Sequence, residues 1–358
     1  MAVREASGRG TFHPLRVARV DRLCEDAAAV TFDVPDDLAE DFRFTAGQSL
    51  TLRRHVGDRE ERRQYSICAA VGAAPRVGVR VVPDGMFSTW LVDEVRAGDE
   101  IEVQAPSGTF GPDPDLGGRH VLIAAGSGIT PVLSIASSLL ANPDAEVTLV
   151  YGNRRAGTVM FSDEVADLKD RFPARFEVIH VLSREPRDVE LFSGRLDADR
   201  MRRILTALVP LKSVDGFWLC GPFEMIEEAR DLLGDLGVAP EKVHRELFFV
   251  DVPPPPVAHT EAGVEGPSSQ VTLTLDGRTT ELSLPRDRPV LDSAQEARAD
   301  LPYACKGGVC GTCRAKVVGG EVHMRRNYAL EDDELTDGYV LTCQSLPVTD
   351  ELALDYDA

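Results

Sequence analysis

The chain has 358 residues, of which 43% are hydrophobic, and its 59 acidic and 39 basic residues produce a formal net charge of −20. That length exceeds one ordinary hydrophobic core and predicts two or three domains, while the strong negative charge argues against nucleic acid or an anionic membrane as a partner. We find neither an apolar run long enough for a membrane helix nor a signal-peptide core within Met1–Gly10, so we expect a cytoplasmic protein.

Residues 10–113 are predicted to form an antiparallel β-barrel. Short alternating apolar runs, such as 15–20, 29–34 and 77–82, are separated by turns, which is typical of barrels and sandwiches. Two motifs in this segment resemble the ferredoxin–NADP reductase superfamily. Arg63-Gln64-Tyr65-Ser66 matches its Arg-x-Tyr-Ser signature, and Gly85-Met86-Phe87-Ser88 has the Gly-x-x-Ser form that the superfamily places at the flavin pyrophosphate.

This resemblance implies an FAD-binding barrel. A guanidinium suits a diphosphate because it is permanently charged and forked, and a tyrosine ring can cover the isoalloxazine face. The hydroxyl of Ser66 can reach flavin N5, where hydride arrives, so Ser66 is also a candidate catalytic residue. The FAD ligands implied by the resemblance are Arg63, Tyr65, Ser66, Gly85, Met86, Phe87 and Ser88.

Residues 114–250 are predicted to form a doubly wound parallel sheet that binds a nicotinamide nucleotide, because apolar strands alternate there with helical stretches. The segment Ala124–Pro131 follows one strand and opens a helix. Its glycines, Gly126 and Gly128, let the backbone approach a pyrophosphate, and Thr130 can hydrogen-bond it. Pro131 suits the first helical turn, where its missing N–H has no partner to lose.

The carboxyl ends of the later strands supply the remaining candidates for this domain. By resemblance, Cys220 and Gly221 approach the nicotinamide ring, with Cys220 a candidate catalytic residue, and Phe248 covers the flavin or is an ordinary core residue. Family members that bind a 2′-phosphate carry a Ser-Arg pair like Ser183-Arg184. With added charge from Arg154 and Arg195, these residues favour NADPH over NADH.

Residues 251–269, which begin with a proline run, are predicted to be a linker to a ferredoxin domain at 270–358. Cys305, Cys310, Cys313 and Cys343 have the plant-type [2Fe–2S] spacing. We expect Gly307, Gly308 and Gly311 to supply the permissive backbone of the loop, and the fourth ligand to come from a strand at Gly338–Gln344. A zinc site is the alternative, although zinc ribbons usually pair their cysteines in two knuckles. The domain resembles plant-type ferredoxins, which have a β-grasp fold.

The three parts together predict a multidomain β, α/β and α+β reductase that passes electrons from NADPH to FAD, to the cluster and then to another protein. Across almost the whole chain, the sequence resembles the reductase components of phenylacetyl-CoA epoxidase, in segments such as Phe192–Asp197 and Gly338–Pro347. That family serves a di-iron oxygenase in phenylacetate catabolism. The second resemblance is to reductases of 3-ketosteroid 9α-hydroxylase or another ring hydroxylase. A redox sensor or assembly protein without turnover is the alternative of a different class.

Overall fold

The computed structural model describes residues 11–57, 59–83, 85–113, 115, 117–248, 267–298, 300–330 and 332–358, without the side chains of Arg59 and Asp332. Most of the predicted linker therefore lies outside the described residues. Contacts divide the chain into two compact units, a larger one holding most of residues 13–248 and a smaller one holding the C-terminal part. Among the helices of the described residues, none combines the length and apolarity needed to cross a bilayer.

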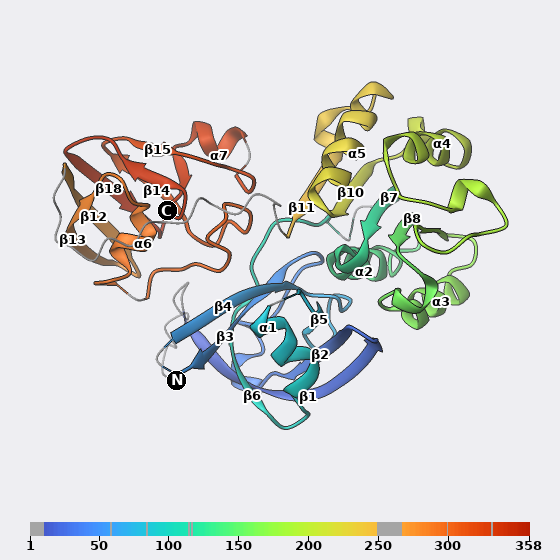
Figure 1. Ribbon diagram of the computed structural model, residues 1–358, viewed down its shortest axis with the longest axis horizontal. Coiled ribbons are helices and arrows are strands. Elements are labelled where there is room, and N and C mark those ends of the chain that lie inside the picture. The colour runs from blue at the N-terminus through green and yellow to red at the C-terminus, as the bar shows by residue number, and fades with distance from the viewer. Residues whose placement is uncertain are drawn as a thin grey trace. The chain divides into compact units, whose positions relative to one another are not determined.

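The first half of the larger unit is the expected antiparallel barrel, formed by six strands in the order β4-β3-β6-β1-β2-β5 (Figure 1). Its strands are β1 (Phe12–Cys24), β2 (Ala27–Asp33), β3 (Ser49–Val56), β4 (Arg59–Ser66), β5 (Arg76–Arg80) and β6 (Glu100–Gln104). A bridge between Ile67, just after β4, and Val77 on β5 brings the two edge strands together. The alternating apolar residues face inward and are fully buried, as at Leu15, Val30 and Leu50. A short helix, α1 (Met86–Thr89), continues into a π-helical turn at Trp90–Glu94.

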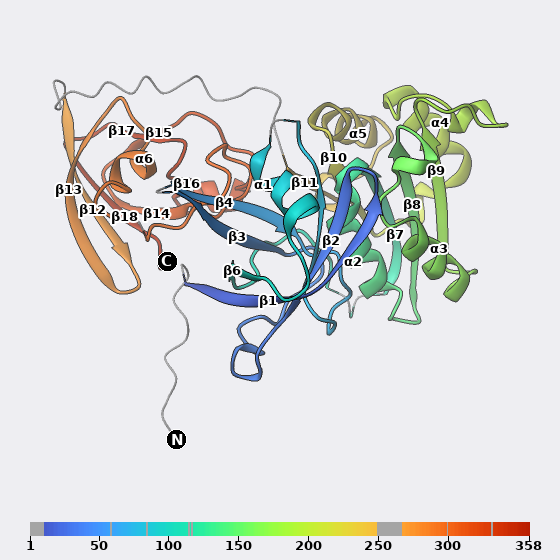
Figure 2. The ribbon, with the colours of Figure 1, turned by 60° about the horizontal axis from the view of Figure 1, so that its bottom comes forward.

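The second half of the larger unit is the expected parallel sheet, with strand order β11-β10-β7-β8-β9 (Figure 2). Its strands are β7 (Gly118–Ala125), β8 (Ala145–Asn153), β9 (Phe176–Leu182), β10 (Gly216–Gly221) and β11 (Val243–Leu247). Helices α2 (Ile129–Leu139) and α3 (Ser162–Arg171) cover one face, and α4 (Ala198–Leu208) and α5 (Phe223–Asp235) cover the other.

One hydrophobic cluster is shared between the barrel and the parallel sheet. Ala27, Ala29 and Cys68 of the barrel part pack with residues of α2 and with Tyr151 of β8. Because α2 is buried between the sheet and the barrel, almost every position along it is apolar or small, instead of showing one polar face. The barrel and the parallel sheet therefore hold their facing edges in a defined geometry.

The smaller unit has the expected β-grasp architecture around a separate core. One sheet has the order β13-β12-β18-β14-β16, with β12 parallel to β18, and a two-stranded sheet joins β15 to β17. The elements are β12 (Ser268–Leu275), β13 (Arg278–Pro285), α6 (Val290–Ala294), β14 (Arg314–Gly319), β15 (Val322–Met324), α7 (Asp332–Thr336), β16 (Tyr339–Leu341), β17 (Ser345–Pro347) and β18 (Glu351–Asp355). The buried core includes Val271, Leu291 and Leu352.

Candidate functional site

The end of β4 meets the end of β11 through a hydrogen bond between two polar side chains. Ser66 Oγ donates to Glu246 Oε2 at 2.9 Å, although the two residues are 180 positions apart. Burial raises the pKa of the Glu246 carboxyl to about 8, against a smaller lowering effect of the Ser66 hydrogen bond. The carboxyl is thus largely protonated at neutral pH, and it can hold or release a proton through the Ser66 hydroxyl.

Cys220 lies directly beside this pair. It is fully buried on β10, where it is in register with Glu246 of β11 on one side and Ala124 of β7 on the other. Burial raises the pKa of its thiol well above the usual value, and Glu246 raises it further once its carboxyl is ionised. The thiol is therefore neutral and is not an activated nucleophile.

Glu246 is a site residue that the sequence interpretation missed. The only local signal is an acidic residue toward the end of a half-buried strand, directly before Leu247 and Phe248. Phe248 follows the end of β11 and is 37% exposed. It is therefore not an ordinary core phenylalanine, and its ring remains accessible for contact with a ligand.

The glycine turn between β7 and α2 is built as expected, but each glycine is required for its own reason. Gly126 has φ +56°, which lies in the left-handed region, and a Cβ on Gly128 would lie 2.1 Å from the main-chain oxygen of Cys220. Pro131 lies in the first turn of α2, as predicted. Thr130 is 1% exposed and its hydroxyl donates to Ser127 O at 3.0 Å. The Thr130 hydroxyl is therefore engaged inside the turn.

A second missed residue, Arg80, reaches this turn from β5 of the barrel. Its Nη1 lies 3.3 Å from the position that a Cβ would take on Gly126, and its Nη2 donates to the main-chain oxygen of Thr158. Asp26 Oδ1 lies 3.3 Å from its Nε. The barrel therefore places a cation at the turn where a pyrophosphate would approach. No signal in the sequence around Arg80 distinguishes it from other strand arginines.

The predicted flavin residues gather along β4 and the start of α1. Tyr65 packs against Phe87 with ring centroids 6.1 Å apart, while Arg63 and Met86 are exposed. The hydroxyl of Ser88 accepts from Val82 N and donates to Gly85 O, both at 3.0 Å. The Ser88 hydroxyl therefore closes the turn at Gly85. The donors that remain near it are the main-chain N–H groups of the first helical turn, which suit an anion.

The structure brings three of the four predicted 2′-phosphate residues together. Ser183 N bonds to Asn153 O, and Arg184 N bonds to Arg154 O, both at 2.8 Å, so Arg154, Ser183 and Arg184 lie side by side and exposed. The fourth, Arg195, is paired with Glu224 of α5 at 2.6 Å. Gly221 is the last residue of β10, at the carboxyl edge of the parallel sheet, and a Cβ on it would lie 2.7 Å from Met225 Cε.

The four cluster cysteines come together as two pairs. Cys305 contacts Cys310, and Cys313 contacts Cys343; within these pairs the partner's hydrogen bond lowers the pKa of the Cys305 and Cys343 thiols. Among the described residues, no three His, Cys, Asp or Glu side chains converge on one metal position. Two thiols for each of two irons is the ligand arrangement of a [2Fe–2S] cluster. The donor set therefore fits the cluster.

The backbone of the cluster loop differs from the expectation in two places. Gly308 and Gly311 have positive φ values of 81° and 67°, but the third positive φ in the loop, 52°, belongs to Lys306 and not to Gly307. Cys343 lies in a turn between β16 and β17, so the prediction that it lies on a strand was wrong. A tight turn lets the fourth thiol face the loop, whereas side chains of an extended strand alternate between two faces.

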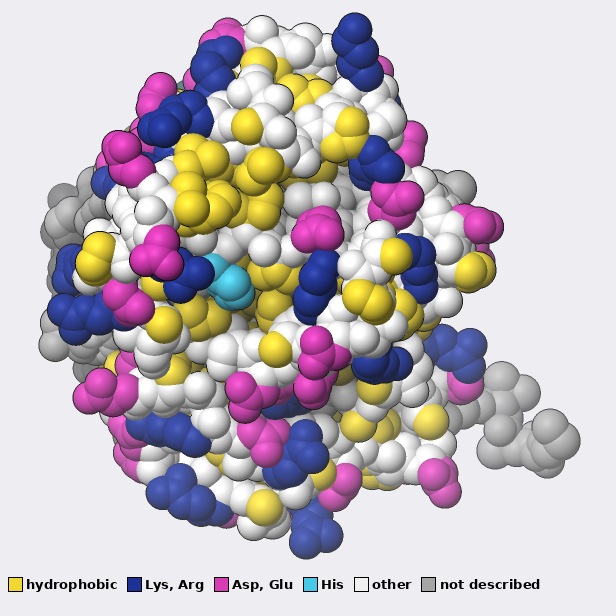
Figure 3. Space-filling model, turned by 90° about the vertical axis from the view of Figure 1, so that its right-hand side faces the viewer, with side chains coloured by type: hydrophobic (Ala, Val, Ile, Leu, Met, Phe, Trp, Pro, Cys, Tyr) yellow, Lys and Arg dark blue, Asp and Glu magenta, His cyan; other side chains and the backbone are white. Residues whose placement is uncertain are grey.

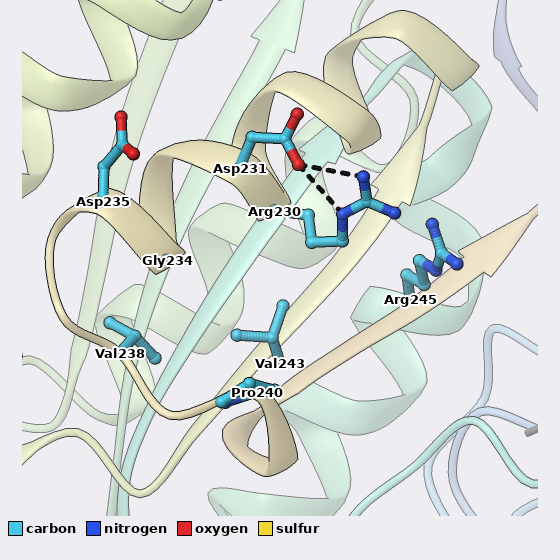
Figure 4. Close-up of a pocket in the computed structure, with 8 residues that line it drawn as sticks. All are labelled: Arg230, Asp231, Gly234, Asp235, Val238, Pro240, Val243 and Arg245. Carbon is cyan, nitrogen blue, oxygen red and sulfur yellow. Dashed lines mark hydrogen bonds and ion pairs between the residues drawn. The ribbon is translucent and has the colours of Figure 1, made fainter. Parts of the chain in front are cut away.

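A surface depression elsewhere in the larger unit contains none of the predicted site residues. It lies between the end of α5 and the start of β11, and Figure 4 shows Arg230 bound to Asp231 at its rim. On the face of the molecule shown in Figure 3, basic and acidic side chains are interspersed, without a continuous patch of one sign.

Comparison with protein-family models assigns the three parts separately. Residues 14–111 match an oxidoreductase FAD-binding domain, residues 122–231 match an oxidoreductase NAD-binding domain, and residues 273–348 match a 2Fe-2S iron-sulfur cluster binding domain. The matched order is the order in which the barrel, the parallel sheet and the cysteine loop occur in the structure.

Curated relatives match the chain over nearly its whole length. A component of the 1,2-phenylacetyl-CoA epoxidase from Escherichia coli (strain K12) is 41% identical over 353 residues, covering 97% of this chain and 98% of the relative. The ferredoxin reductase component of 3-ketosteroid-9-alpha-monooxygenase from Rhodococcus rhodochrous is 34% identical, covering 96% of each chain. The solved structure of phthalate dioxygenase reductase has the same fold, with a TM-score of 0.59 at 24% identity and coverage of 96% and 98%.

Proposed function

The chain belongs to the family of oxygenase reductases that includes this phenylacetyl-CoA epoxidase component and the 3-ketosteroid-9-alpha-monooxygenase reductase, and we propose that it is the NADPH-dependent reductase of a phenylacetyl-CoA epoxidase. The observation that carries this proposal is the 41% identity with the epoxidase component across 97% of the chain, against 34% with the steroid enzyme's reductase. Its partner would be the di-iron oxygenase component of the same system.

Three bound groups would act in series. When bound, FAD converts a two-electron hydride donor into a source of single electrons, and the [2Fe–2S] cluster carries them one at a time. The protein aligns these groups and supplies protons. We assign proton holding to Ser66 and Glu246, because their 2.9 Å hydrogen bond lies where the barrel meets the nucleotide sheet and the pKa of Glu246 is about 8.

We assign the flavin to the residues of β4, α1 and the end of β11. Arg63 and the main-chain N–H groups of Met86 and Phe87 would hold the diphosphate, while Tyr65 and Phe248 would cover the ring. Gly85 and Ser88 would act by shaping the turn, since the Ser88 hydroxyl is already bonded to Gly85 O.

We assign the nicotinamide nucleotide to the carboxyl edge of the parallel sheet. Gly126, Gly128 and Arg80 would receive the pyrophosphate, and Cys220 and Gly221 would border the nicotinamide ring. The preference for NADPH rests on Arg154, Ser183 and Arg184, which form an exposed cluster with two cations and one hydroxyl. We place the reaction in the cytoplasm, because a reducing compartment keeps four ligand thiols available.

A reconstitution experiment tests the proposal. The purified chain, NADPH and the separately purified oxygenase component of a phenylacetyl-CoA epoxidase are mixed with phenylacetyl-CoA, and epoxide formation is followed by mass spectrometry. We expect product only when all components are present, and faster with NADPH than with NADH. Product formation with the oxygenase of a 3-ketosteroid hydroxylase, but not with the epoxidase component, would instead assign the chain to the steroid system.

The family relation favours a turnover enzyme over a redox sensor, because its members are components of oxygenase systems. Ferricyanide provides a direct check that needs no oxygenase. We expect many equivalents of ferricyanide to be reduced per chain with excess NADPH. A sensor would pass on only the electrons held by its own bound carriers, and ferricyanide reduction would then stop.

A further inference from the structure

Gln344 is a buried amide that directly follows the fourth cluster cysteine. It is 2% exposed, and its Nε2 lies 3.6 Å from Cys343 Sγ, 3.0 Å from Cys343 O and 2.9 Å from Lys306 O. In all three contacts Nε2 is the donor, so its two N–H groups are shared among the three acceptors. The side chain therefore contacts the sulfur of one ligand and the main chain directly after another, Cys305.

The surrounding chain holds the backbone of residue 344 in place beside the cysteine loop. The main-chain carbonyl of Gln344 accepts from Arg325 N at 2.9 Å, and its main-chain N–H donates to Leu341 O at 2.8 Å. A Cβ on Gly308 would lie 3.0 Å from Gln344 Cγ, so the cysteine loop closes directly on the Gln344 side chain. Gln344 thus connects the turn that carries Cys343 to the loop that carries the other three cysteines.

We propose that Gln344 is a positioning residue that raises the reduction potential of the [2Fe–2S] cluster. One-electron reduction adds a negative charge that is shared with the ligand sulfurs, and an N–H group directed at a sulfur stabilises the more negative state more strongly. Burial strengthens this effect, because the surroundings screen the charge less than water does. The inference rests on the cluster assignment in the proposed function, but not on the nucleotide or the oxygenase partner.

The test compares variants that remove the donor with minimal change in size. Gln344→Met has no N–H group, and Gln344→Glu has a carboxyl that can donate only while protonated. The midpoint potential of the cluster is measured in the full-length protein, with its flavin and cluster bound, by redox titration followed by electron paramagnetic resonance. We expect a shift to more negative potential in both variants.

Gln295 provides the matched control. Its Oε1 accepts from Lys306 Nζ at 2.7 Å, so Gln295→Met also removes a partly buried amide contact at the loop, but one that involves no ligand sulfur. We expect its midpoint to stay at the wild-type value. An unchanged midpoint in both Gln344 variants, at wild-type iron content, would overturn the inference.

Two further outcomes separate this inference from the proposed function. Loss of the cluster from both Gln344 variants would also overturn the inference, since it would show that Gln344 serves only to retain the metal. Wild-type protein that contains zinc, or no iron, would instead refute the cluster part of the proposed function.

Discussion

Glu246 is the residue whose chemistry depends most strongly on its surroundings. An exposed glutamate is ionised at neutral pH, but burial at the end of β11 raises the pKa of this one to about 8. We expect Glu246→Gln to lower the rate of NADPH-dependent ferricyanide reduction by about 100-fold, because general acid–base groups contribute at least that much. Wild-type activity should change around pH 8 as the carboxyl loses its proton, and the variant's profile should be flat there.

Asp235→Asn is the control variant for Glu246→Gln, because it neutralises a carboxylate that is exposed and paired with Arg202. Its pH profile should match the wild type. A wild-type transition near pH 8 that persists in Glu246→Gln would assign that transition to another group.

Arg184 is the residue on which the choice of nucleotide is expected to depend. A charge-assisted hydrogen bond contributes about 1.5–3 kcal/mol, which corresponds to roughly a 10- to 100-fold change in affinity. We therefore expect Arg184→Ala to raise KM for NADPH by about that factor while leaving KM for NADH unchanged. Arg195→Ala should have a smaller effect, because Arg195 is already paired with Glu224. Equal losses with the two nucleotides would place Arg184 outside the 2′-phosphate site.

At the scale of secondary-structure elements, Gly128 controls how closely α2 approaches β10. A Cβ there would meet the main-chain oxygen of Cys220 at 2.1 Å, and neither backbone segment can move without shifting a whole element. We expect Gly128→Ala to lower the free energy of unfolding by about 3 kcal/mol, the upper end for overpacking, in urea unfolding of the larger unit.

Gly234 in α5 offers the control for Gly128→Ala, since no atom outside its own stretch of helix lies within 4 Å of the position of its Cβ. Gly234→Ala should raise stability by about 0.5–1 kcal/mol through helix propensity. Similar losses in both variants would indicate a general intolerance of the domain and not a close approach at Gly128.

An aromatic cluster that joins three strands of the parallel sheet is expected to make the free energy of unfolding depend on pH. Trp218 on β10 stacks on His244 of β11 with ring centroids 4.1 Å apart, and its Nε1 donates to His120 Nδ1 of β7 at 3.4 Å. Burial lowers the pKa of both histidines below 6.5.

Below pH 6.5 the unfolded chain therefore binds protons that the folded chain excludes, and the free energy of unfolding falls as the pH decreases. The expected loss is up to about 1.4 kcal/mol per pH unit for each histidine. His244→Phe keeps an aromatic partner for Trp218 without a titrating group. Urea unfolding at pH 7.5 and 5.5 should show a smaller loss in His244→Phe than in the wild type; an equal loss would exclude His244 as a contributor.

At the scale of the whole molecule, net charge bears on how the reductase finds its acceptor. Gln270–Ala358 contains 16 acidic and nine basic residues, a net charge of −7. If acidic residues of this domain steer docking onto a basic oxygenase surface, the rate of oxygenase reduction should fall as salt rises from 50 to 500 mM. Ferricyanide reduction measured over the same range is the control for effects on the reductase itself. A rate of oxygenase reduction that does not respond to salt would contradict electrostatic steering.

Much of this architecture could be predicted from local patterns. Strand–helix alternation predicted the parallel sheet, short alternating runs predicted the barrel, and the spacing of Cys305, Cys310, Cys313 and Cys343 predicted the cluster loop. These features depend on neighbours within a few residues along the chain, or on a spacing that covalent geometry imposes, so a sequence displays them directly.

The partners of individual polar groups could not be predicted in the same way. The Ser88 and Thr130 hydroxyls bond within their own turns, and Lys306 takes the positive φ that we expected at Gly307. Each outcome depends on which acceptor lies within about 3 Å once the turn has closed, which is a matter of local packing that a motif does not specify.

The sequence by itself determined the order of the three parts, the residue types available for FAD, nucleotide and cluster, and the family. Only the tertiary structure decided that Ser66 meets Glu246 across 180 residues and that Arg80 of the barrel reaches Gly126 of the sheet. The raised pKa of Glu246 was likewise decided only by the tertiary structure, because it reflects burial that the barrel and the parallel sheet produce together. Contacts between distant segments arise from the packing of whole elements, and no short stretch of sequence encodes them alone.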